Sequence, residues 1–491
     1  MKLKLENVDK ISDKLYKGRG KEFTFRVPVV DVMDILSSLG KKHLPWSDRQ
    51  TIGPQRGIPL VMFVSKDGLA RYSIGAIEQG YEFTVEVRLD EAAAEYVVKF
   101  EYRDPTEVTF YVGDEPADWQ TVVDDYRKHV QVTPMRAPAA AYEPTFCSWY
   151  GIHHQVNQKW SLDAMKLMHE LGVNTYIIDD GWFFPEKGEW GSYVKTGDWR
   201  VAHEKFHDLK AMVADMHAMG CRVLLWIAPF MVGRESNTYK SMAKYLRGPE
   251  DRQVRWLTTN DEHALNHVVD TCARLINDYG MDGLKLDFID SLPYGEANGL
   301  GTFYERLKSM FPDKIFELRQ MYANIFASQY GMIFRGIDTP LDYWSNLSNM
   351  ILLRVFTPEP PLHMDYLYWH YDEHEVNVAR HMMVSMFFIP TFSFDPMKLK
   401  PAHKAIIRKW LDFYNEHRDT LLNKGFRVQK LNIVVGDQSK QIVGYFQPDI
   451  VEVEGAEIYV LNGSESDTVI LKREGKHELH RVPIGEYKVV R

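Results

Sequence analysis

Hydrophobic positions along the chain follow three different patterns. Before about residue 120, segments such as KEFTFRVPV and YEFTVEVRL alternate apolar with polar residues, which is the two-residue period of half-buried strands. The same alternation returns after about residue 425, in QIVGYFQP and AEIYVLNG. Between these regions, short apolar runs are followed repeatedly by segments with helical spacing. The pattern predicts a β-sandwich-like domain, a central α/β unit and a small antiparallel β domain.

The central region contains eight candidate strands, and helical segments separate most of them. In chain order the strands are TFCSWYGIH, NTYIIDDGW, CRVLLWIAPF, VRWLTT, GLKLDFID, KIFELRQ, MIFRGIDT and TFSFD. Segments such as SLDAMKLMHELG have the spacing of amphipathic helices. Eight strands alternating with helices fit a (β/α)8 TIM barrel, which typically takes about 250 residues. A doubly wound sheet is the alternative, but no GxGxxG follows any of these strands.

A proline-containing segment, VTPMRAPAAAYEP, lies between the first two regions and is typical of a linker. We therefore expect an N-terminal β-sandwich-like domain over residues 1–135 and the barrel over residues 136–424. Residues 425–491 are expected to form the C-terminal β domain.

Charge and composition exclude some classes of partner. The chain carries 59 Lys and Arg against 68 Asp and Glu, a formal net charge of −9, and no basic stripe. This balance argues against nucleic acid or an anionic membrane as a partner. The first ten residues, MKLKLENVDK, lack the apolar run of a secretory signal, and no stretch approaches the roughly 18 apolar residues of a membrane span. We therefore expect a cytoplasmic protein.

No metal site or cofactor is predicted. Cys147, Cys221 and Cys272 are widely spaced, without CxxC or Cys/His zinc spacing, which is typical of buried reduced thiols. His153 and His154 follow the first strand without a carboxylate at ligand spacing. The 12 Trp and 26 Tyr fit a carbohydrate site, which uses aromatic faces, although many of them will belong to the core.

Charged and aromatic side chains gather where the predicted strands end. In a TIM barrel the carboxyl ends of the strands carry the active site. These ends hold Trp149, Tyr150, Asp179, Asp180, Trp182, Trp226, Lys285, Asp287, Arg319, Gln320, Arg335, Asp338, Asp342 and Trp344. No Ser/His/Asp order, HExxH or Walker loop competes with this set.

Carboxylates on separate strands suit glycoside hydrolysis, in which one attacks the anomeric carbon and the other protonates the leaving oxygen. Lys285 stands two residues before Asp287 and would favour its ionised form, so we expect Asp287 to be the nucleophile. The alternative is a plain buried ion pair. Asp338 is the candidate acid, although Arg335 would oppose its protonation unless it turns toward the sugar or another carboxylate.

These motifs resemble glycoside hydrolase family 36, the α-galactosidases of the melibiase clan, over roughly residues 145–395. TFCSWYG, YIIDDGWF and YGMDGLKLDF look like the family's first-strand, second-strand and nucleophile motifs. GDWRVAHEKFHDLKAMVADMHAMGCRVLLWIAPFMV follows its third-strand segment, and FRGIDTPLDYW is similar to the clan's acid/base stretch.

The resemblance implies a retaining hydrolase with Asp287 as nucleophile and Asp338 as acid/base. It implies sugar binding by Trp149, Asp179, Asp180, Lys285 and Arg335. Trp182 and Trp226 are further candidates for sugar contact, with core packing as the alternative. Asp179 and Asp180 have an alternative role as caps of the following turn.

Departures from the family pattern leave the donor sugar and the identity of the acid open. Ala228 stands where the family usually has an acidic residue, which leaves open another donor: an α-N-acetylgalactosaminide, an α-glucoside, or a raffinose-synthase-like transfer. The spacing from Arg335 to Asp338 is shorter than usual, so Asp342 remains a rival acid. A non-catalytic carbohydrate-binding protein is the alternative from another class. The expected partner is a small carbohydrate, and a homo-oligomer is left open.

Overall fold

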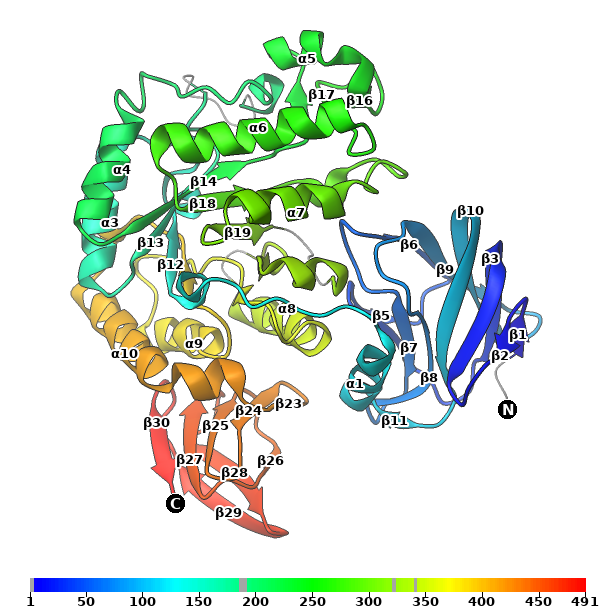
Figure 1. Cartoon of the computed structure of the whole chain (residues 1–491). Coiled ribbons are helices and arrows are strands. Elements are labelled where there is room, and N and C mark those ends of the chain that lie inside the picture. Colours follow the sequence, from blue (N-terminus) through cyan, green and yellow to red (C-terminus); the bar gives the residue numbers. More distant parts are fainter. Residues whose placement is uncertain (1–3, 185–191, 320–323, 340–341) are drawn as a thin grey trace.

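The computed structural model describes residues 4–184, 192–319, 324–339 and 342–491. An N-terminal β domain stands beside a central α/β barrel, and a C-terminal β domain lies against the barrel's final helices (Figure 1). No helix in the described ranges is long and apolar enough to cross a bilayer.

The N-terminal domain is an antiparallel sheet built around two long strands, β3 and β10, which pair with each other. Its aromatic core includes Phe23, Phe25, Phe100 and Phe110, which face inward because alternate strand residues share one side. The elements are β1 (Lys4–Glu6), β2 (Asp9–Lys10), β3 (Leu15–Pro28), β4 (Asp34–Ser37), β5 (Gly40–His43), β6 (Ser47–Ile52), β7 (Leu60–Val64), β8 (Leu69–Ala76), β9 (Phe83–Asp90), β10 (Glu95–Gly113), β11 (Ala117–Asp118) and helix α1 (Trp119–His129).

Parallel strands form the barrel, as the sequence predicts. Within the described ranges they are β12 (Thr145–Cys147), β13 (Thr175–Ile178), β14 (Arg222–Ile227), β18 (Gly283–Leu286), β19 (Ile315–Leu318), β20 (Ile333–Arg335), β21 (Leu362–His363) and β22 (Thr391–Phe392). β22 pairs with β12, and backbone bonds join it to the segment after β21: Leu367 N–H to the Thr391 carbonyl (2.7 Å) and Ser393 N–H to the Leu367 carbonyl (3.0 Å). The sheet thus comes round on itself.

Helices alternate with these strands and cover the outside of the barrel (Figure 1). The helices are α2 (Trp149–Ile152), α3 (Gln158–Glu170), α4 (Leu209–Ala218), α5 (Asn237–Ser241), α6 (Glu262–Tyr279), α7 (Leu300–Met310), α8 (Tyr343–Phe356), α9 (Glu375–Ser385) and α10 (Pro401–Asn423). α6 illustrates why they form where they do. Asp261 caps its first N–H groups, and Gly280, at φ 73°, ends it in the left-handed region that suits glycine.

One strand assigned to the barrel from sequence is wrong, and one barrel strand was missed. VRWLTT contains β17 (Val254–Leu257), which pairs antiparallel with β15 (Met231–Gly233) and β16 (Leu246–Arg247) in a separate sheet outside the barrel. The barrel strand missed by sequence is β21, whose two residues lie in the proline-containing segment PEPPLHMD and show no apolar run. GLKLDFID is therefore the fourth barrel strand and not the fifth.

The C-terminal part, described throughout, contains a five-stranded and a three-stranded sheet. Their pairing is mainly antiparallel, while β25–β27 and β26–β28 run parallel. Apolar residues such as Val443, Val460 and Val469 form a separate core. The strands are β23 (Phe426–Gln429), β24 (Asn432–Gly436), β25 (Lys440–Tyr445), β26 (Ile450–Val453), β27 (Glu457–Asn462), β28 (Thr468–Arg473), β29 (Lys476–Arg481) and β30 (Tyr487–Val490).

The N-terminal domain packs against the loop that follows β18. The Glu82 carboxylate accepts hydrogen bonds from the backbone N–H of Gly295 (2.5 Å) and from the side chain of Gln55 (2.6 Å). On the barrel side, the Asn324 amide donates to the carbonyls of Gly53 (2.6 Å) and Gly57 (3.3 Å). The β domain therefore supports loops on the carboxyl side of the barrel strands.

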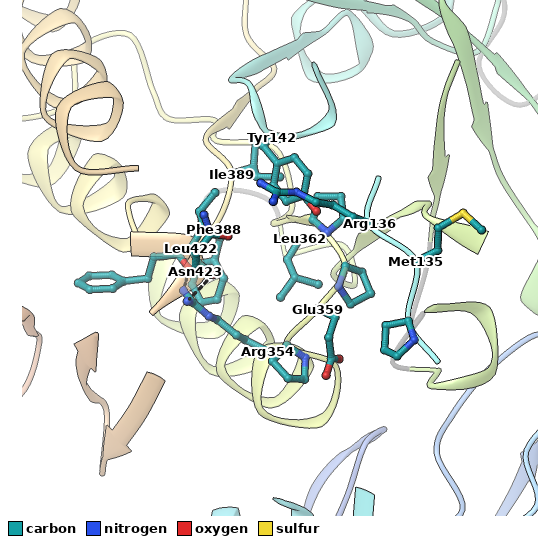
Figure 2. A pocket seen from close by; sticks show the side chains of 15 residues that line it. Met135, Arg136, Tyr142, Arg354, Glu359, Leu362, Phe388, Ile389, Leu422 and Asn423 are labelled. Carbon is teal, nitrogen blue, oxygen red and sulfur yellow. Dashed lines mark hydrogen bonds between the residues drawn. The ribbon is translucent and has the colours of Figure 1, made fainter. Parts of the chain in front are cut away.

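A hollow of about 380 Å³ lies at the amino end of the strands, away from those loops (Figure 2). Arg354, at the end of α8, is buried beside it and donates to the carbonyls of Leu421 (2.7 Å) and Leu422 (3.4 Å) and to that of Phe387. The guanidinium thus binds carbonyls at the carboxyl end of α10, where a helix carries partial negative charge. Arg354 therefore has a structural role, which is to join α8 to the end of α10 and to the segment around Phe387.

Candidate active site

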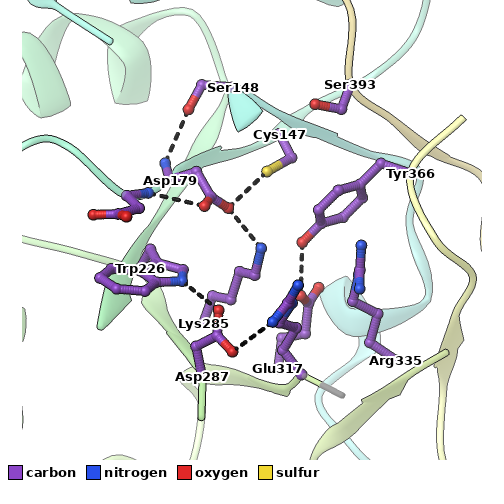
Figure 3. A network of polar contacts seen from close by, with 12 residues as sticks. Cys147, Ser148, Asp179, Trp226, Lys285, Asp287, Glu317, Arg335, Tyr366 and Ser393 are labelled. Atoms are coloured by element: carbon purple, nitrogen blue, oxygen red, sulfur yellow. Dashed lines mark hydrogen bonds and ion pairs between the residues drawn. The ribbon is translucent and has the colours of Figure 1, made fainter. Parts of the chain in front are cut away.

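Asp287 directly follows β18 and is 4% exposed. Its Oδ2 accepts a hydrogen bond from the indole N–H of Trp226 (2.7 Å). Its Oδ1 accepts from a guanidinium nitrogen of Arg319 (2.9 Å) and from the backbone N–H of Phe288 (2.7 Å). Figure 3 shows this carboxylate facing into a network of polar side chains. Each oxygen of the carboxylate thus has at least one hydrogen-bond donor.

Lys285 lies two residues before Asp287. Its ion-pair partner is Asp179 and not Asp287, which was the predicted partner. The Lys285 ammonium is 2.6 Å from Oδ2 of Asp179, and the salt bridges of the described residues pair Asp287 with Arg319 instead. Burial opposes the charge of Lys285, but Asp179, Cys147 and Glu317 together outweigh it and raise the lysine pKa. The predicted Lys285–Asp287 pair is therefore wrong, and Arg319 takes the place of the lysine.

Asp179 and Asp180 directly follow β13 and are both buried. Asp179 accepts the Cys147 thiol (3.0 Å) on Oδ2 and the backbone N–H of Asp180 (2.8 Å) on Oδ1. Asp180 lies 2.9 Å from Nε2 of His154. The next residue, Gly181, has φ 108°, and a Cβ there would lie 2.7 Å from the Cα of His154. Asp179 therefore accepts a backbone N–H as well as side-chain donors, and Asp180 pairs with a histidine. A glycine is required at position 181 because the backbone of His154 lies so close.

Asp338, after β20, has a carboxylate that is 37% exposed and is bound by two arginines, one on β20 itself and one just beyond β19. Arg335 donates to its Oδ1 (2.6 Å), and Arg319 donates to its Oδ2. Burial favours the neutral acid, but Arg335 and Arg319 outweigh it and lower the pKa of Asp338 to about 2. An Asp338 that acts as an acid was expected to need Arg335 to turn toward another carboxylate. Arg335 does bind Asp365, but it keeps its bond to Asp338 as well.

Several residues of this network were missed by sequence reasoning. Asp365 follows β21, the strand that was not recognised, and accepts bonds from Arg335 and from the N–H groups of Thr339 (2.5 Å) and Tyr366 (2.8 Å). Glu317 lies inside β19, completely buried against His363. The sequence did contain a sign of Glu317: it is a charged residue inside the apolar run KIFELRQ, just as Lys285 is a charged residue inside the apolar run GLKLDFID.

Tyr366 organises the cations of the site. Its ring centroid is 4.7 Å from the Lys285 ammonium and 4.4 Å from the Arg335 guanidinium, within cation–π range. Its hydroxyl donates to Glu317 (2.8 Å), as Figure 3 shows. The tyrosine ring therefore contacts both cations.

The three predicted tryptophans have different positions. Trp149 is half-buried and packs edge-on against His153 and His154, with ring centroids 4.9 and 5.1 Å away. Trp226 is buried and reaches the site through its N–H bond to Asp287. Trp182 has no exposed surface, and its N–H binds the Trp226 carbonyl (2.9 Å). The prediction that Trp182 contacts a sugar is wrong, because it is core that supports Trp226.

Asp342 lies outside the network. It is an exposed N-cap of α8, where its carboxylate accepts the backbone N–H groups of Trp344 (2.9 Å) and Ser345 (3.2 Å). As a rival acid or a sugar ligand it therefore has no geometric support. Ala228 follows β14 and is buried, and Gln320 lies outside the described residues. No group of three His, Cys, Asp or Glu side chains in the described ranges is arranged to hold a metal ion.

Comparisons with known proteins agree with this fold. Residues 120–295 match the family model Melibiase. An α-galactosidase of Escherichia coli is 23% identical over 408 residues, which cover 73% of this chain and 56% of the relative. Alpha-galactosidase 1 of Pediococcus pentosaceus is 28% identical over 171 residues, covering 30% of this chain and 23% of the relative. The chain thus spans about half the length of the first of these relatives and less of the second.

Solved structures extend the likeness to almost the whole chain. The GH36 α-galactosidase AgaA of Geobacillus stearothermophilus superposes with a TM-score of 0.67 at 15% identity, over 97% of this chain and 78% of that one. An α-galactosidase of Thermus thermophilus gives 0.63 at 15% identity, over 88% and 95%. At this identity the likeness concerns the fold. Residues 120–295 of this chain therefore match the melibiase family model, and the chain as a whole has the fold of glycoside hydrolase family 36 α-galactosidases.

Proposed function

We propose that this protein is a retaining α-galactosidase with Asp287 as nucleophile and Asp338 as acid/base. The observation that carries the proposal is the placement of Asp287. It lies at the carboxyl end of a strand within the melibiase match, with Trp226 and Arg319 donating to it. Arg319 links it to Asp338 on a neighbouring strand. The α-galactosidase names of the relatives supply the reaction class.

The proposed reaction has two displacements. In the first, an Asp287 oxygen attacks the anomeric carbon, and the bond to the leaving oxygen breaks as Asp338 gives that oxygen a proton. The product is a galactosyl ester on Asp287. In the second, Asp338 takes a proton from water, the water oxygen attacks the anomeric carbon, and the ester bond breaks. Asp287 is again a carboxylate, and the anomeric configuration is retained.

The remaining predicted residues would hold the terminal sugar. Asp179 and Asp180 offer carboxylate oxygens, while Lys285 and Arg335 offer N–H donors from deep in the barrel. Trp149, half-buried, offers an aromatic face. A polar set of this kind suits a ligand with many hydroxyl groups.

Small α-galactoside oligosaccharides are the substrates we propose. Structures of the Geobacillus stearothermophilus enzyme are described as complexes with stachyose and with raffinose. Cys147, Cys221 and Cys272 are buried free thiols, which suits a reducing compartment. We therefore propose cytoplasmic action on imported sugars.

The test is Asp287→Ala assayed on an aryl α-galactoside. Turnover should fall by several orders of magnitude, and added azide should restore product release as β-galactosyl azide, the inverted product. Asp338→Ala should retain most of kcat/KM on aryl substrates, whose leaving groups need no proton, and lose it on raffinose; its kcat should fall on both, because the second displacement loses its base. Asp342→Ala is the matched control and should keep wild-type rates. Full activity of Asp287→Ala would contradict the proposal.

A second candidate is the same chemistry on another donor sugar, and Ala228 favours it. This small side chain follows β14 close to Trp226, where the family pattern places an acid. Aryl α-galactoside, α-N-acetylgalactosaminide and α-glucoside should be compared by kcat/KM. Preference for the galactoside supports the first proposal. Calorimetric binding of a sugar without turnover of any of them would indicate a binding protein.

A further inference from the structure

Arg319 joins the two proposed catalytic carboxylates through a single guanidinium. It stands just beyond β19, and its side chain is 10% exposed. One terminal nitrogen donates to Oδ1 of Asp287 (2.9 Å), and the other donates to Oδ2 of Asp338. The planar fork of arginine can serve two acceptors at once, which a lysine ammonium on a flexible stem does less well.

The proposed reaction demands a particular distribution of charge over this pair. Before the first displacement, Asp287 must be ionised and Asp338 must hold a proton. In the galactosyl ester, Asp287 is neutral, and Asp338 has become a carboxylate because it gave its proton away. One negative charge is therefore present in both states, and it moves from one carboxylate to the other.

Arg335 is poorly placed to follow this charge. It is 1% exposed, pairs with the buried Asp365 and lies over the ring of Tyr366. Arg319, in contrast, forms ion pairs with Asp287 and Asp338, the two residues between which the charge moves.

Resting on the function proposed above, we infer that Arg319 is a positioning residue that follows the negative charge from Asp287 to Asp338. With Asp287 ionised, Arg319 binds Asp287 and must loosen its bond to Asp338 before that residue can be an acid. With the ester formed, the guanidinium binds Asp338 and favours the carboxylate that acts as base.

The electrostatic surroundings of Asp338 support this role. Burial opposes its charged form, as does the neighbouring Asp365 carboxylate, whereas Arg335, Arg319 and Lys285 favour it. With both arginines bound, the pKa of Asp338 is about 2. An acid of that strength is protonated in roughly one molecule in 10⁵ at pH 7. Loosening one arginine therefore changes the acid's protonation strongly.

The test compares wild type with Arg319→Gln and Arg319→Lys. In Arg319→Gln, the alkaline limb of kcat/KM against pH should shift up by at least one unit, since this limb reports the acid of the free enzyme. The second displacement should slow by tenfold or more, giving a burst of aryl alcohol before steady state. Arg319→Lys should restore one of the two steps and not both. Arg354→Lys, a buried arginine at the other end of the barrel, controls for lost stability and should leave the pH profile unchanged.

Carboxyl carbon-13 titration gives a readout that does not require turnover, with the Asp338 resonance assigned by its loss in Asp338→Asn. The Asp338 midpoint should rise by at least one pH unit in Arg319→Gln. An unchanged midpoint, or unchanged pH profiles in an active enzyme, would overturn the role of Arg319 while leaving the proposed function intact. Inactivity of the wild type on every α-galactoside would instead overturn the proposed function, and the titration would still decide whether Arg319 controls Asp338.

Discussion

Asp290, three residues beyond Asp287, is a partly buried carboxyl at the edge of the site. Burial and the charge of Asp287 raise its pKa to about 6, although Arg319 and Arg56 work in the opposite direction. Its Oδ1 accepts no hydrogen bond from the residues that the structure describes. This carboxylate is therefore held in an unfavourable environment when it is charged.

Asp290→Asn should change how stability depends on pH. The folded-state pKa lies above the ordinary 3.8, so the folded protein binds more protons than the unfolded chain between about pH 4 and about pH 6. Wild-type stability should fall as pH rises through that window, and the variant should lose this slope. At pH 7 the variant should be more stable by about 1–2 kcal/mol, measured by urea unfolding. Asp251→Asn, on the surface, is the control, and an equal slope in all three proteins would refute the argument.

Tyr366→Phe tests the support beneath the site's cations. The ring and its contacts with Lys285 and Arg335 remain, but Glu317 loses a hydrogen-bond donor in a fully buried position. The free energy of unfolding should fall by about 1–3 kcal/mol, as expected for a buried charged acceptor left with one donor fewer. Denaturant unfolding measures this loss. Tyr294→Phe, at a tyrosine that is 45% exposed, should change it little. Equal stability of the two variants would show that the hydroxyl does not matter.

At the scale of elements, α8 depends on Asp342 for its start. The carboxylate satisfies N–H groups in the first turn. Asp342→Ala should therefore destabilise the protein by about 1 kcal/mol in urea unfolding, the usual effect of losing an N-cap. Asp342→Asn, which keeps an acceptor, should recover most of that loss. If both variants unfold like wild type, the cap contributes nothing measurable.

Prediction from sequence succeeded for strands with a clear hydrophobic pattern. It failed for strands whose place in a sheet depends on which strand they pair with. β13, β14 and β18 are mainly apolar segments, and each was recognised as a barrel strand, although β18 was counted one place too late. β17 has a strand's composition, but its partners lie outside the barrel, which periodicity cannot show. β21 has two residues and carries no period at all.

Site prediction followed the same limit. Residues at the ends of recognised strands were found, including Asp179, Asp287 and Arg335. Asp365 was missed because its strand was missed. The partner of Lys285 was misassigned because two residues on one strand lie side by side along it, while an ion pair can form across to Asp179 on another strand. Spacing along a strand gives the face of a side chain and not its partner.

At the scale of the whole molecule, the N-terminal domain reaches the loop that carries Asp290 and Gly295 through Glu82. Glu82→Leu would leave the Gly295 N–H and the Gln55 amide without this acceptor inside the interface. The free energy of unfolding should fall by about 1–3 kcal/mol, and trypsin should cleave the junction between the domains faster. Glu101→Gln, a more exposed acid of the same domain, is the control for both measurements. Unchanged stability and cleavage would mean that the interface does not need Glu82.

The closure of the barrel has a consequence for its slow motions. β21 and β22 have two residues each, whereas β14 has six and is paired on both sides. The amides of Leu367 and Ser393, which join the ends of the sheet, should exchange with deuterium faster than those of β14, because fewer neighbouring bonds must break to open them. Exchange followed by mass spectrometry would show this order. Local unfolding of the barrel should then begin at the β21–β22 junction. β14, which carries Trp226, and β18, which precedes Asp287, should be among the last strands to open.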